Sequence, residues 1–464
     1  MKNQHSVLSG PPRLRQELKP MVRLAGPVAL AELGWMMMGL VDTLMIGRVS
    51  AEALGAVGIG NNLFLMIAIF GFGLLFGLDY LIATAFGAGD LKKCYHVLVQ
   101  GLYLSIINTI PFTVLSYIVI SLLPKAGIQQ AVLPDAVAYM KIATWALLPM
   151  FFGMALRRYL QSRNIVLPFT FALIIANIVN AIANYALIFG HFGFPKLGAV
   201  GAAWATFIGM SIICIILLIS TLIIAKQEQE FIDIDLFKFD RQIMRQLLRL
   251  GFPASFHLLM DVGAFTFVTV LAGRLHPNAL AAHHIVLKLA TFTFMVPLGI
   301  STAGAVRVGQ AIGRNNILGA SHAGWTALGF GAGFMVFTGV TFVLFPEILM
   351  RGFTNDLEIV ETGASILFIA AIFQLFDGIQ VVSAGILRGT GDTKMAMICN
   401  FIGHWFLGLP TGYFLCFERN WGIAGLWVGL CIGLIFVSIG LFQFWVRRIG
   451  QMQASPIEQA RAPV

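Results

Sequence analysis

The most constraining feature of this sequence is a series of apolar runs, each long enough to cross a lipid bilayer. A helix needs about 20 apolar residues to span roughly 30 Å of hydrocarbon, and only helices and closed barrels satisfy their backbone hydrogen bonds there. The runs have helical length and lack the alternation of about ten residues that marks a barrel strand. We predict twelve transmembrane helices, near residues 21–47, 54–86, 95–123, 136–160, 166–190, 198–225, 251–273, 280–312, 318–345, 360–388, 394–417 and 422–446.

The distribution of charge predicts how these helices are oriented. Only 11% of the 464 residues are charged, against about a quarter in soluble domains. Most Lys and Arg residues fall in the tails and in the loops after even-numbered spans, and cytoplasmic loops hold the basic excess. We therefore expect a protein of the cell membrane with both termini in the cytoplasm. The net charge of +9 then reflects topology, and nucleic acid is not an expected partner.

The chain contains an internal repeat of six spans. The motif RLAGP ending at Pro27 returns as RLGFP ending at Pro253, and GRVSAEALGA from Gly47 returns as GRLHPNALAA from Gly273, both at an offset of 226 residues. A parallel repeat of this kind predicts two lobes with the cargo site between them. The expected segments are a cytoplasmic tail over 1–20, an N-lobe over 21–225, a cytoplasmic linker over 226–250, a C-lobe over 251–446 and a cytoplasmic tail over 447–464.

Apart from Glu361 at a span edge, five acidic residues fall within the predicted spans: Glu32, Asp42, Asp79, Asp261 and Asp377. Each costs a few kcal/mol at the bilayer centre, so such residues tend to be functional. A carboxyl group held there can take up a proton or bind a cation. We favour this role for Asp42, Asp261 and Asp377, and leave Glu32 and Asp79 open between function and local pairing. The repeat mates of Asp42 and Asp261 are Val268 and Trp35, so the halves carry different acids.

Other polar residues in the spans have two interpretations each. Asn177, Asn180 and Asn184 lie on one helix face, where they either hold helices together or orient a carboxyl group and supply oxygens to Na⁺. We expect Lys288 to pair with a carboxylate, with snorkelling to the membrane surface and a place in the cargo cleft as the alternatives. His283 and His284 lack a third ligand, so we expect them at the membrane interface and predict no metal site.

Several motifs together resemble the multidrug and toxic compound extrusion (MATE) family, in its NorM-like branch. They are GPVALAELGWMMMGLVDTLMIGRVSAEALGAVGIG, LGFPASFHLLMDVGAFTFVTVLAG, FTFMVPLGISTAGAVRVGQAIGRNN and LFDGIQVVSAGILRGTGDTK, which are similar to that family's spans 1, 7, 8 and 10. The resemblance covers essentially the whole chain. It implies a twelve-helix exporter with two lobes, which drives polycyclic cationic drugs outward in exchange for H⁺ or Na⁺ and needs no cofactor.

The resemblance also assigns roles to single residues. Asp42 matches the first-span carboxylate that binds the coupling ion, Asn180 and Asn184 match its polar neighbours, and Asp261 and Asp377 match the acids of spans 7 and 10. These five residues are the predicted ion-coupling set, with Na⁺ expected at Asp42, Asn180 and Asn184. The three aspartates and Lys288 are the predicted cargo contacts. Relatives often have Glu in place of Asp261 and, in some cases, Asp in place of Asn184, which weakens a Na⁺ site here.

The predicted mechanism is alternating access by a monomer, in which ion binding at the acids lowers the affinity for cargo. A lipid-linked or polysaccharide flippase is one alternative, but it requires a cationic cleft, and the spans hold one deeply placed Lys against five acids. An intramembrane enzyme is disfavoured because the sequence lacks His-Glu-x-x-His, Gly-x-Ser-x-Gly and Walker A motifs. A passive channel is not distinguished by residues alone.

Overall fold

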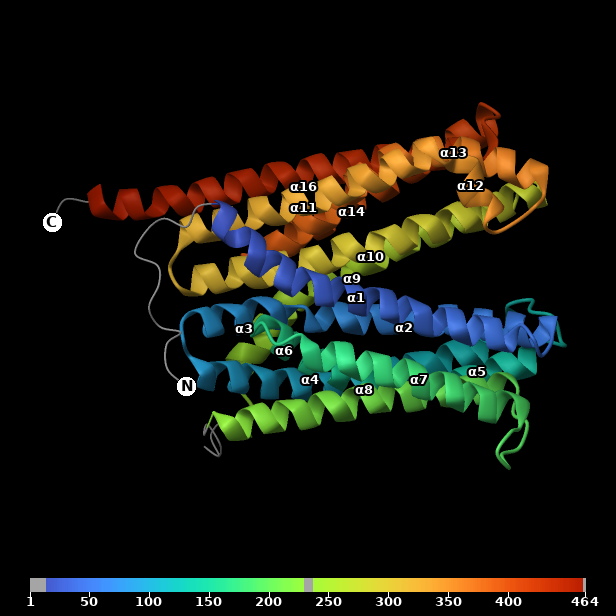
Figure 1. Ribbon diagram of the computed structural model, residues 1–464, viewed down its shortest axis with the longest axis horizontal. Coiled ribbons are helices and arrows are strands. Elements are labelled where there is room, and N and C mark those ends of the chain that lie inside the picture. The colour runs from blue at the N-terminus through green and yellow to red at the C-terminus, as the bar shows by residue number, and fades with distance from the viewer. Residues whose placement is uncertain (1–13, 229–236, 462–464) are drawn as a thin grey trace. The chain divides into compact units, whose positions relative to one another are not determined.

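The computed structural model describes residues 14–228 and 237–461, and within these ranges the fold is all-α, as predicted (Figure 1). The first half contains α1 Leu14–Ile46, α2 Ala51–Leu75, α3 Gly77–Gly87, α4 Leu91–Leu122, α5 Leu133–Trp145, α6 Leu147–Ser162, α7 Leu167–Phe189 and α8 Ala199–Gln227. The second half contains α9 Arg241–Ala272, α10 Pro277–Gly313, α11 Ile317–Leu344, α12 Pro346–Arg351, α13 Leu357–Gly389, α14 Lys394–Asn400, α15 Leu409–Tyr413 and α16 Gly422–Arg461.

The membrane spans follow the predicted series closely. Within the described ranges, ten helical segments are long and apolar enough to cross a bilayer, and α5 with α6 forms an eleventh that bends by 43°. The remaining predicted span, 394–417, is helical but irregular, because π-helical runs at Phe401–Gly408 and Phe414–Glu418 alternate with α14 and α15. The helices also extend past the predicted span ends. For example, α9 begins at Arg241, directly after the capping residue Asp240.

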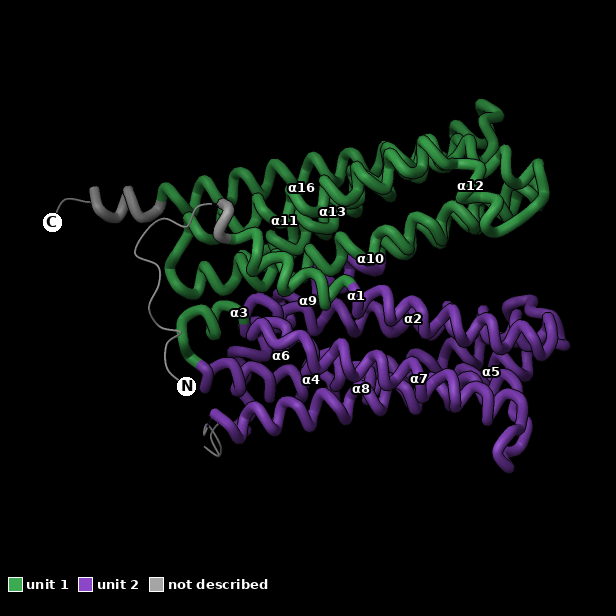
Figure 2. The backbone as a smooth tube through the Cα atoms, viewed as in Figure 1, with its two compact units in different colours: residues 1–29, 83–90, 260–464 green, residues 30–82, 91–259 purple. Residues whose placement is uncertain are grey.

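The helices form two compact units (Figure 2). Unit 1 comprises the described parts of residues 1–29, 83–90 and 260–464, and unit 2 comprises those of residues 30–82 and 91–259. Neither unit equals one half of the sequence, since three helices run from one unit into the other. Within these helices the chain changes unit after Ala29 in α1, after Ile82 in α3 and after Leu259 in α9, and it also returns to unit 2 after Asp90, between α3 and α4.

Glycine contacts explain why each unit includes a helix segment from the other half. In unit 2, a Cβ on Gly73 of α2 would lie 2.3 Å from Cα of Ser255 in α9. In unit 1, a Cβ on Gly299 of α10 would lie 2.6 Å from the backbone nitrogen of Ala29 in α1. These distances leave room for hydrogen only. Both residues of the second contact are 226 positions from those of the first, so the predicted repeat recurs as a pair of equivalent close helix contacts.

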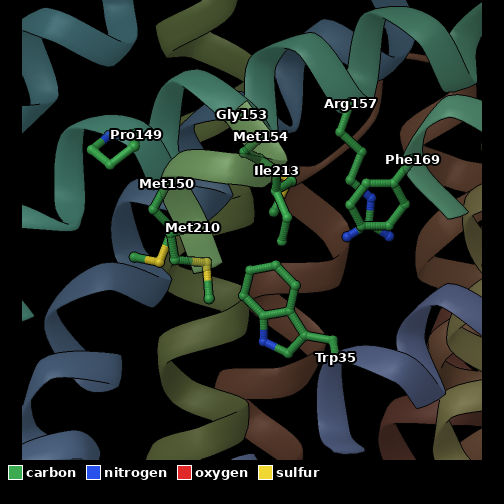
Figure 3. Close-up of a pocket in the computed structure, with 9 residues that line it drawn as sticks. All are labelled: Trp35, Pro149, Met150, Gly153, Met154, Arg157, Phe169, Met210 and Ile213. Carbon is green, nitrogen blue, oxygen red and sulfur yellow. The ribbon is translucent and has the colours of Figure 1, made fainter. Parts of the chain in front are cut away.

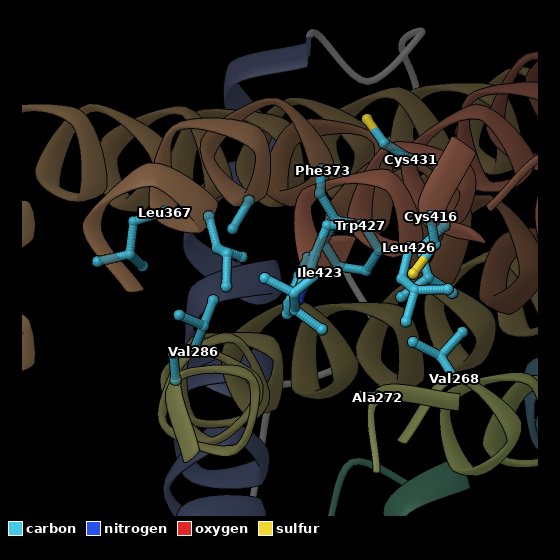
Figure 4. Packing of buried hydrophobic residues seen from close by; sticks show 14 of the residues in the cluster. Val268, Ala272, Val286, Leu367, Phe373, Cys416, Ile423, Leu426, Trp427 and Cys431 are labelled. Atoms are coloured by element: carbon cyan, nitrogen blue, oxygen red, sulfur yellow. The ribbon is translucent and has the colours of Figure 1, made fainter. Parts of the chain in front are cut away.

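A buried apolar cluster fills the part of unit 1 formed by α9, α10, α13 and α16 (Figure 4). Trp427 and Phe373 lie at its centre, with ring centroids 5.8 Å apart. His283 lies beside them, fully buried, and its ring nitrogens face Thr269 Oγ1 at 3.0 Å and the indole N–H of Trp427 at 3.2 Å. The expectation that His283 lies at the membrane interface is therefore wrong, because both of its polar atoms have partners inside the core.

Candidate functional site

Asp42, on α1, faces the polar residues of α7 and α8 within unit 2. Its carboxylate accepts hydrogen bonds from the Asn184 amide and from the Thr206 hydroxyl, the latter at 3.3 Å. The same Asn184 amide donates to Asn180 Oδ1 at 3.1 Å. Asn180 and Asn184 are fully buried, and Asp42 is half-buried. Within the described ranges, no Lys, Arg or His forms an ion pair with Asp42.

The spacing of the asparagines on α7 sets this arrangement. Asn180 and Asn184 are four residues apart and therefore point to the same side of the helix. Asn177 lies one turn earlier and instead donates to the backbone carbonyl of Gly34, at 3.1 Å, which ties α7 to α1. Sequence reasoning placed all three on one face, and the structure divides them between a contact with the carboxylate and a helix contact.

Two residues of this site were missed from the sequence. Thr206 also donates to the carbonyl of Ala202 on its own helix, a common habit of Thr in apolar helices, so nothing in the sequence marked it. Tyr139 on α5 is almost fully buried and interacts with Thr206 and Asp42. Its signal, a Tyr inside an apolar span, is ordinary for a core residue.

The site has polar atoms to spare. Asn180 Nδ2 and Asn184 Oδ1 are buried and have no hydrogen-bond partner among the described residues. An unsatisfied buried oxygen beside a carboxylate without a cationic partner offers ligands for a proton or a small cation. Groups of three or more His, Cys, Asp and Glu suited to a metal ion are absent from the part of the chain that the structure describes.

A second acidic cluster lies in unit 1, between α9, α13 and the π-helical run. Asp261 accepts a hydrogen bond from the Asn400 amide at 3.1 Å, and His404 Nε2 lies 3.6 Å from the same carboxylate oxygen. Asp377 on α13 is buried and interacts electrostatically with Asp261. The structure thus brings two of the predicted acids together and adds Asn400 and His404, whose signal was two polar residues four apart inside an apolar span.

Glu32 and Asp79 have a different environment, since both are neutralised by arginines of α6. Arg157 pairs with Glu32, and Arg158 pairs with Asp79 at 3.1 Å, with both guanidinium groups almost fully buried. In the sequence, these two arginines lie at the end of the fourth predicted span and were assigned to the loop that follows it, so their pairing with acids was not predicted. These two acids therefore have the structural partners that Asp42 lacks.

Lys288 does not form the predicted ion pair with any described residue. Its side chain is exposed on α10, as is that of His284 one turn earlier. The long flexible side chain of an exposed Lys can carry its ammonium group to water or to the lipid headgroups, where the charge is solvated without an ion pair. The pairing expected for Lys288 is therefore not found among residues 14–228 and 237–461.

A small cavity in unit 2 lies beside Arg157 (Figure 3). It is about 20 Å³ in volume, which is room for one water molecule. The lining is otherwise apolar and consists of Trp35, Pro149, Met150, Gly153, Met154, Phe169, Met210 and Ile213. The cavity is too small for a polycyclic cargo and does not include Asp42.

The family model MatE matches the chain twice, over residues 27–186 and 253–414. The chain belongs to the MatE family. The probable multidrug resistance protein NorM of Mesorhizobium japonicum is 35% identical to it over 448 residues, covering 94% of each chain. The multidrug resistance protein NorM of Burkholderia vietnamiensis is 34% identical over 437 residues, covering 93% of this chain and 94% of that one.

Solved structures share the MatE fold of this chain. A MOP superfamily transporter from Pyrococcus furiosus gives a TM-score of 0.86 at 22% identity and covers 97% of this chain and 100% of its own. The eukaryotic MATE transporter AtDTX14 gives 0.83 at 19% identity, covering 95% and 99%. The two MatE matches begin at Pro27 and Pro253, the same offset as the internal repeat. This MatE chain is an integral membrane transporter and not an enzyme.

Proposed function

We propose that this MatE chain exports cationic drugs by alternating access, in exchange for H⁺ or Na⁺ that bind at its unneutralised acids. The observation that carries the proposal is the contrast among the acids of the spans. Glu32 and Asp79 are paired with buried arginines, whereas Asp42 has only neutral donors. Because an uncompensated carboxylate in an apolar helix bundle is costly, its charge favours binding of a proton, a metal cation or a cationic cargo.

Competition for this negative charge accounts for transport in one direction. A ligand shifts a protein between two conformations only by its difference in affinity for them. In the proposal, the coupling ion neutralises Asp42, and the side chains of Asn180 and Asn184 help to hold that ion. Asp261 and Asp377 form a second ion-coupling set, which binds the cargo at one stage of the cycle and the ion at another. The exposed Lys288 stays a proposed cargo contact.

The proposed topology, lobes and oligomeric state are taken from the sequence. We place both termini and the 226–250 linker in the cytoplasm, because the basic residues gather in the tails and even-numbered loops. The lobes are proposed over 21–225 and 251–446, and the working unit is proposed to be a monomer. The relatives from Mesorhizobium japonicum and Burkholderia vietnamiensis carry multidrug resistance in their names, which supports drugs as the cargo class.

The test is efflux of a fluorescent organic cation from proteoliposomes with an imposed pH or Na⁺ gradient. We expect an imposed ion gradient to accelerate efflux by the wild-type protein well above the rate that the dye gradient alone drives. Asp42→Asn keeps the size of the side chain and removes its charge, so gradient-driven efflux should disappear. Glu361→Gln, which changes an exposed acid of α13, is the matched control and should transport normally. Efflux that ignores both gradients would identify a passive channel, and full coupling in Asp42→Asn would refute the role of Asp42.

A further inference from the structure

The π-helical run Phe401–Gly408 presents polar side chains to one short stretch of α9. Asn400 donates to Asp261, His404 lies against the same carboxylate, and the indole N–H of Trp405 donates to the carbonyl of Met260 at 3.2 Å. In an α-helix, residues 400 and 405 would point in different directions. A π-turn closes its hydrogen bonds five residues apart instead of four, so both the fourth and fifth residues return to the side of the first. Asn400 and His404, four residues apart, would share one side of either type of helix, and the irregular helix adds Trp405 to that side.

Packing on the opposite side holds this run in place. A Cβ on Gly403 would lie 2.7 Å from the carbonyl oxygen of Gly433, and one on Gly429 would lie 2.3 Å from Cα of Gly412. These close contacts fix the run and α15 against α16. The orientation of His404 toward α9 is therefore a feature of the packed unit and not of one side-chain rotamer.

His404 is fully buried, and neither of its ring nitrogens has a hydrogen-bond partner among the described residues. The other buried histidine of this unit, His283, has partners at both nitrogens. Buried polar atoms are normally satisfied, and an unsatisfied imidazole beside a carboxylate is unusual for a purely structural residue. The nearby Asn400 Oδ1 is also buried and without a partner in the described chain.

The charged groups around His404 come from two helices. Asp261 on α9 is 3.6 Å away, and Asp377 on α13 interacts with Asp261. On the third neighbour, α16, residues 422–446 include no Asp, Glu, Lys, Arg or His, and Cys431 is their only titratable side chain. On α14, the titratable side chains are Lys394, at its first residue, and Cys399. The cluster therefore holds two carboxylates and one imidazole, which needs added positive charge to become neutral.

We propose that His404 and Asp261 together bind the coupling proton in unit 1, so that the ion exchanged at this cluster is H⁺. The inference rests on the proposed antiport function and specifies its ion. A proton arriving from water binds the imidazole, which then forms an ion pair with Asp261 and cancels one of the two negative charges. A cationic cargo held by both carboxylates is thereby weakened and released. Loss of the proton to water on the other side restores both charges.

The test is the pH dependence of binding of a fluorescent organic cation to the purified full-length protein, measured by anisotropy. For the wild type, we expect affinity to fall by at least about fivefold from pH 8 to pH 6, within the usual range of coupling between ligands. His404→Gln replaces the imidazole with an amide that still offers an N–H donor but cannot titrate in this range, so the affinity of this variant for the dye should stay nearly constant. His322→Gln, which changes a half-buried histidine on α11, is the control and should behave as wild type.

A second variant, at Asp261, and a measurement with Na⁺ provide two further tests of the proton site. Asp261→Asn removes the partner of His404 and should also flatten the pH dependence, which serves if His404→Gln does not yield monodisperse protein. An unchanged pH profile in both variants would overturn the inference, as would displacement of the dye by Na⁺ at constant pH in wild type and His404→Gln alike. Gradient-dependent efflux in the wild type would still support antiport in those cases, whereas its absence would refute the proposed function itself.

Discussion

The two acidic clusters of this transporter occupy different repeat positions and differ in chemistry. In unit 2, Asp42 is a single carboxylate that neutral amide and hydroxyl groups hold. Its repeat mate, Val268, lies in the apolar cluster of unit 1. In unit 1, Asp261 interacts electrostatically with a second carboxylate, Asp377, and has the imidazole of His404 beside it. The mate of Asp261 is Trp35, which lines the small apolar cavity of unit 2.

This difference shows how duplicated halves can specialise. Each half retains the glycine contacts that build the fold, but each has apolar side chains where the other has its acid. One carboxylate with neutral donors can accept one positive charge, while a pair of carboxylates can exchange a proton for a larger cation. The paired acids Glu32 and Asp79 form a third class, because their buried arginines leave no charge to neutralise.

The largest expected effect on stability comes from removing the arginine that pairs with a buried acid. Arg158→Ala leaves Asp79 buried without its cation, so the free energy of unfolding should fall by about 3–5 kcal/mol. Thermal or denaturant unfolding of the purified protein measures this change. Replacing Arg158 and Asp79 together by Leu should recover much of the loss, and Arg351→Ala, at an exposed arginine, should cost little. Equal effects of Arg158→Ala and Arg351→Ala would remove the distinction between paired and unpaired acids.

Neutralising an unpaired acid should have the opposite outcome, a large loss of transport with little loss of stability. Asp377→Asn is expected to reduce gradient-driven cation efflux by about tenfold or more without lowering the unfolding temperature, because it removes a buried charge that has no salt-bridge partner among the described residues. Proteoliposome efflux and thermal unfolding are measured on the same preparation. If the unfolding temperature drops as much as in Arg158→Ala, Asp377 is a structural residue.

A smaller effect should follow from removing one donor to Asp42. Thr206→Val keeps the shape of the side chain and deletes the hydroxyl, while Asn184 still donates to the carboxylate. A single hydrogen bond contributes about 0.5–1.5 kcal/mol, and this one stabilises the charged carboxylate, so the proton concentration that half-activates efflux should fall about two- to tenfold. Thr221→Val is a matched control on the same helix, since the Thr221 hydroxyl has no hydrogen-bond partner among the described residues. Identical curves for both variants would exclude Thr206 from the site.

The smallest expected effect concerns Asp240, which lies just before α9 and outside the membrane spans. It accepts hydrogen bonds from the backbone N–H groups of Ile243 and Gln242 at the start of α9, and His96 lies 3.3 Å away. These interactions lower the pKa of Asp240 below its usual value, and the hydrogen bond from the Ile243 N–H makes the largest contribution.

A carboxylate with a lowered pKa stabilises the fold above its unfolded pKa, and this contribution disappears as the pH falls through the folded pKa. Asp240→Ala should therefore cost about 1 kcal/mol near neutral pH, as other N-cap losses do. The difference from wild type should shrink below about pH 4. Unfolding measured across this range checks the sign, and a cost that grows at acid pH would contradict it.

The sequence was sufficient to predict the helical fold, since each apolar run must satisfy its own backbone in lipid. The repeat was readable from motifs such as RLAGP and RLGFP, which end two residues before Ala29 and Ser255, the residues that Gly299 and Gly73 contact closely. The exchange of helix segments between the units was not predictable, because hydropathy does not reveal which neighbour a helix packs against. The same limit applied to the irregular span, where Phe401–Gly408 is as apolar as any regular helix.

The acids were predictable, but their partners were not. Asp42, Asp261 and Asp377 stand out in apolar runs, and the four-residue spacing of Asn180 and Asn184 predicted one face. Glu32 and Asp79 looked equally exceptional until the structure placed the arginines of α6 beside them. Contacts between helices far apart in sequence decide which acid is neutralised, and one sequence alone has no signal for them.

The central claim is that the unneutralised acids exchange an inorganic cation for the cargo. Its most direct test imposes a gradient of a fluorescent organic cation across proteoliposomes and records H⁺ and Na⁺ on the opposite side, with no ion gradient at the start. We predict that the dye gradient drives one of these ions in the opposite direction in the wild type and not in Asp42→Asn. Movement of the dye without movement of either ion would contradict the account.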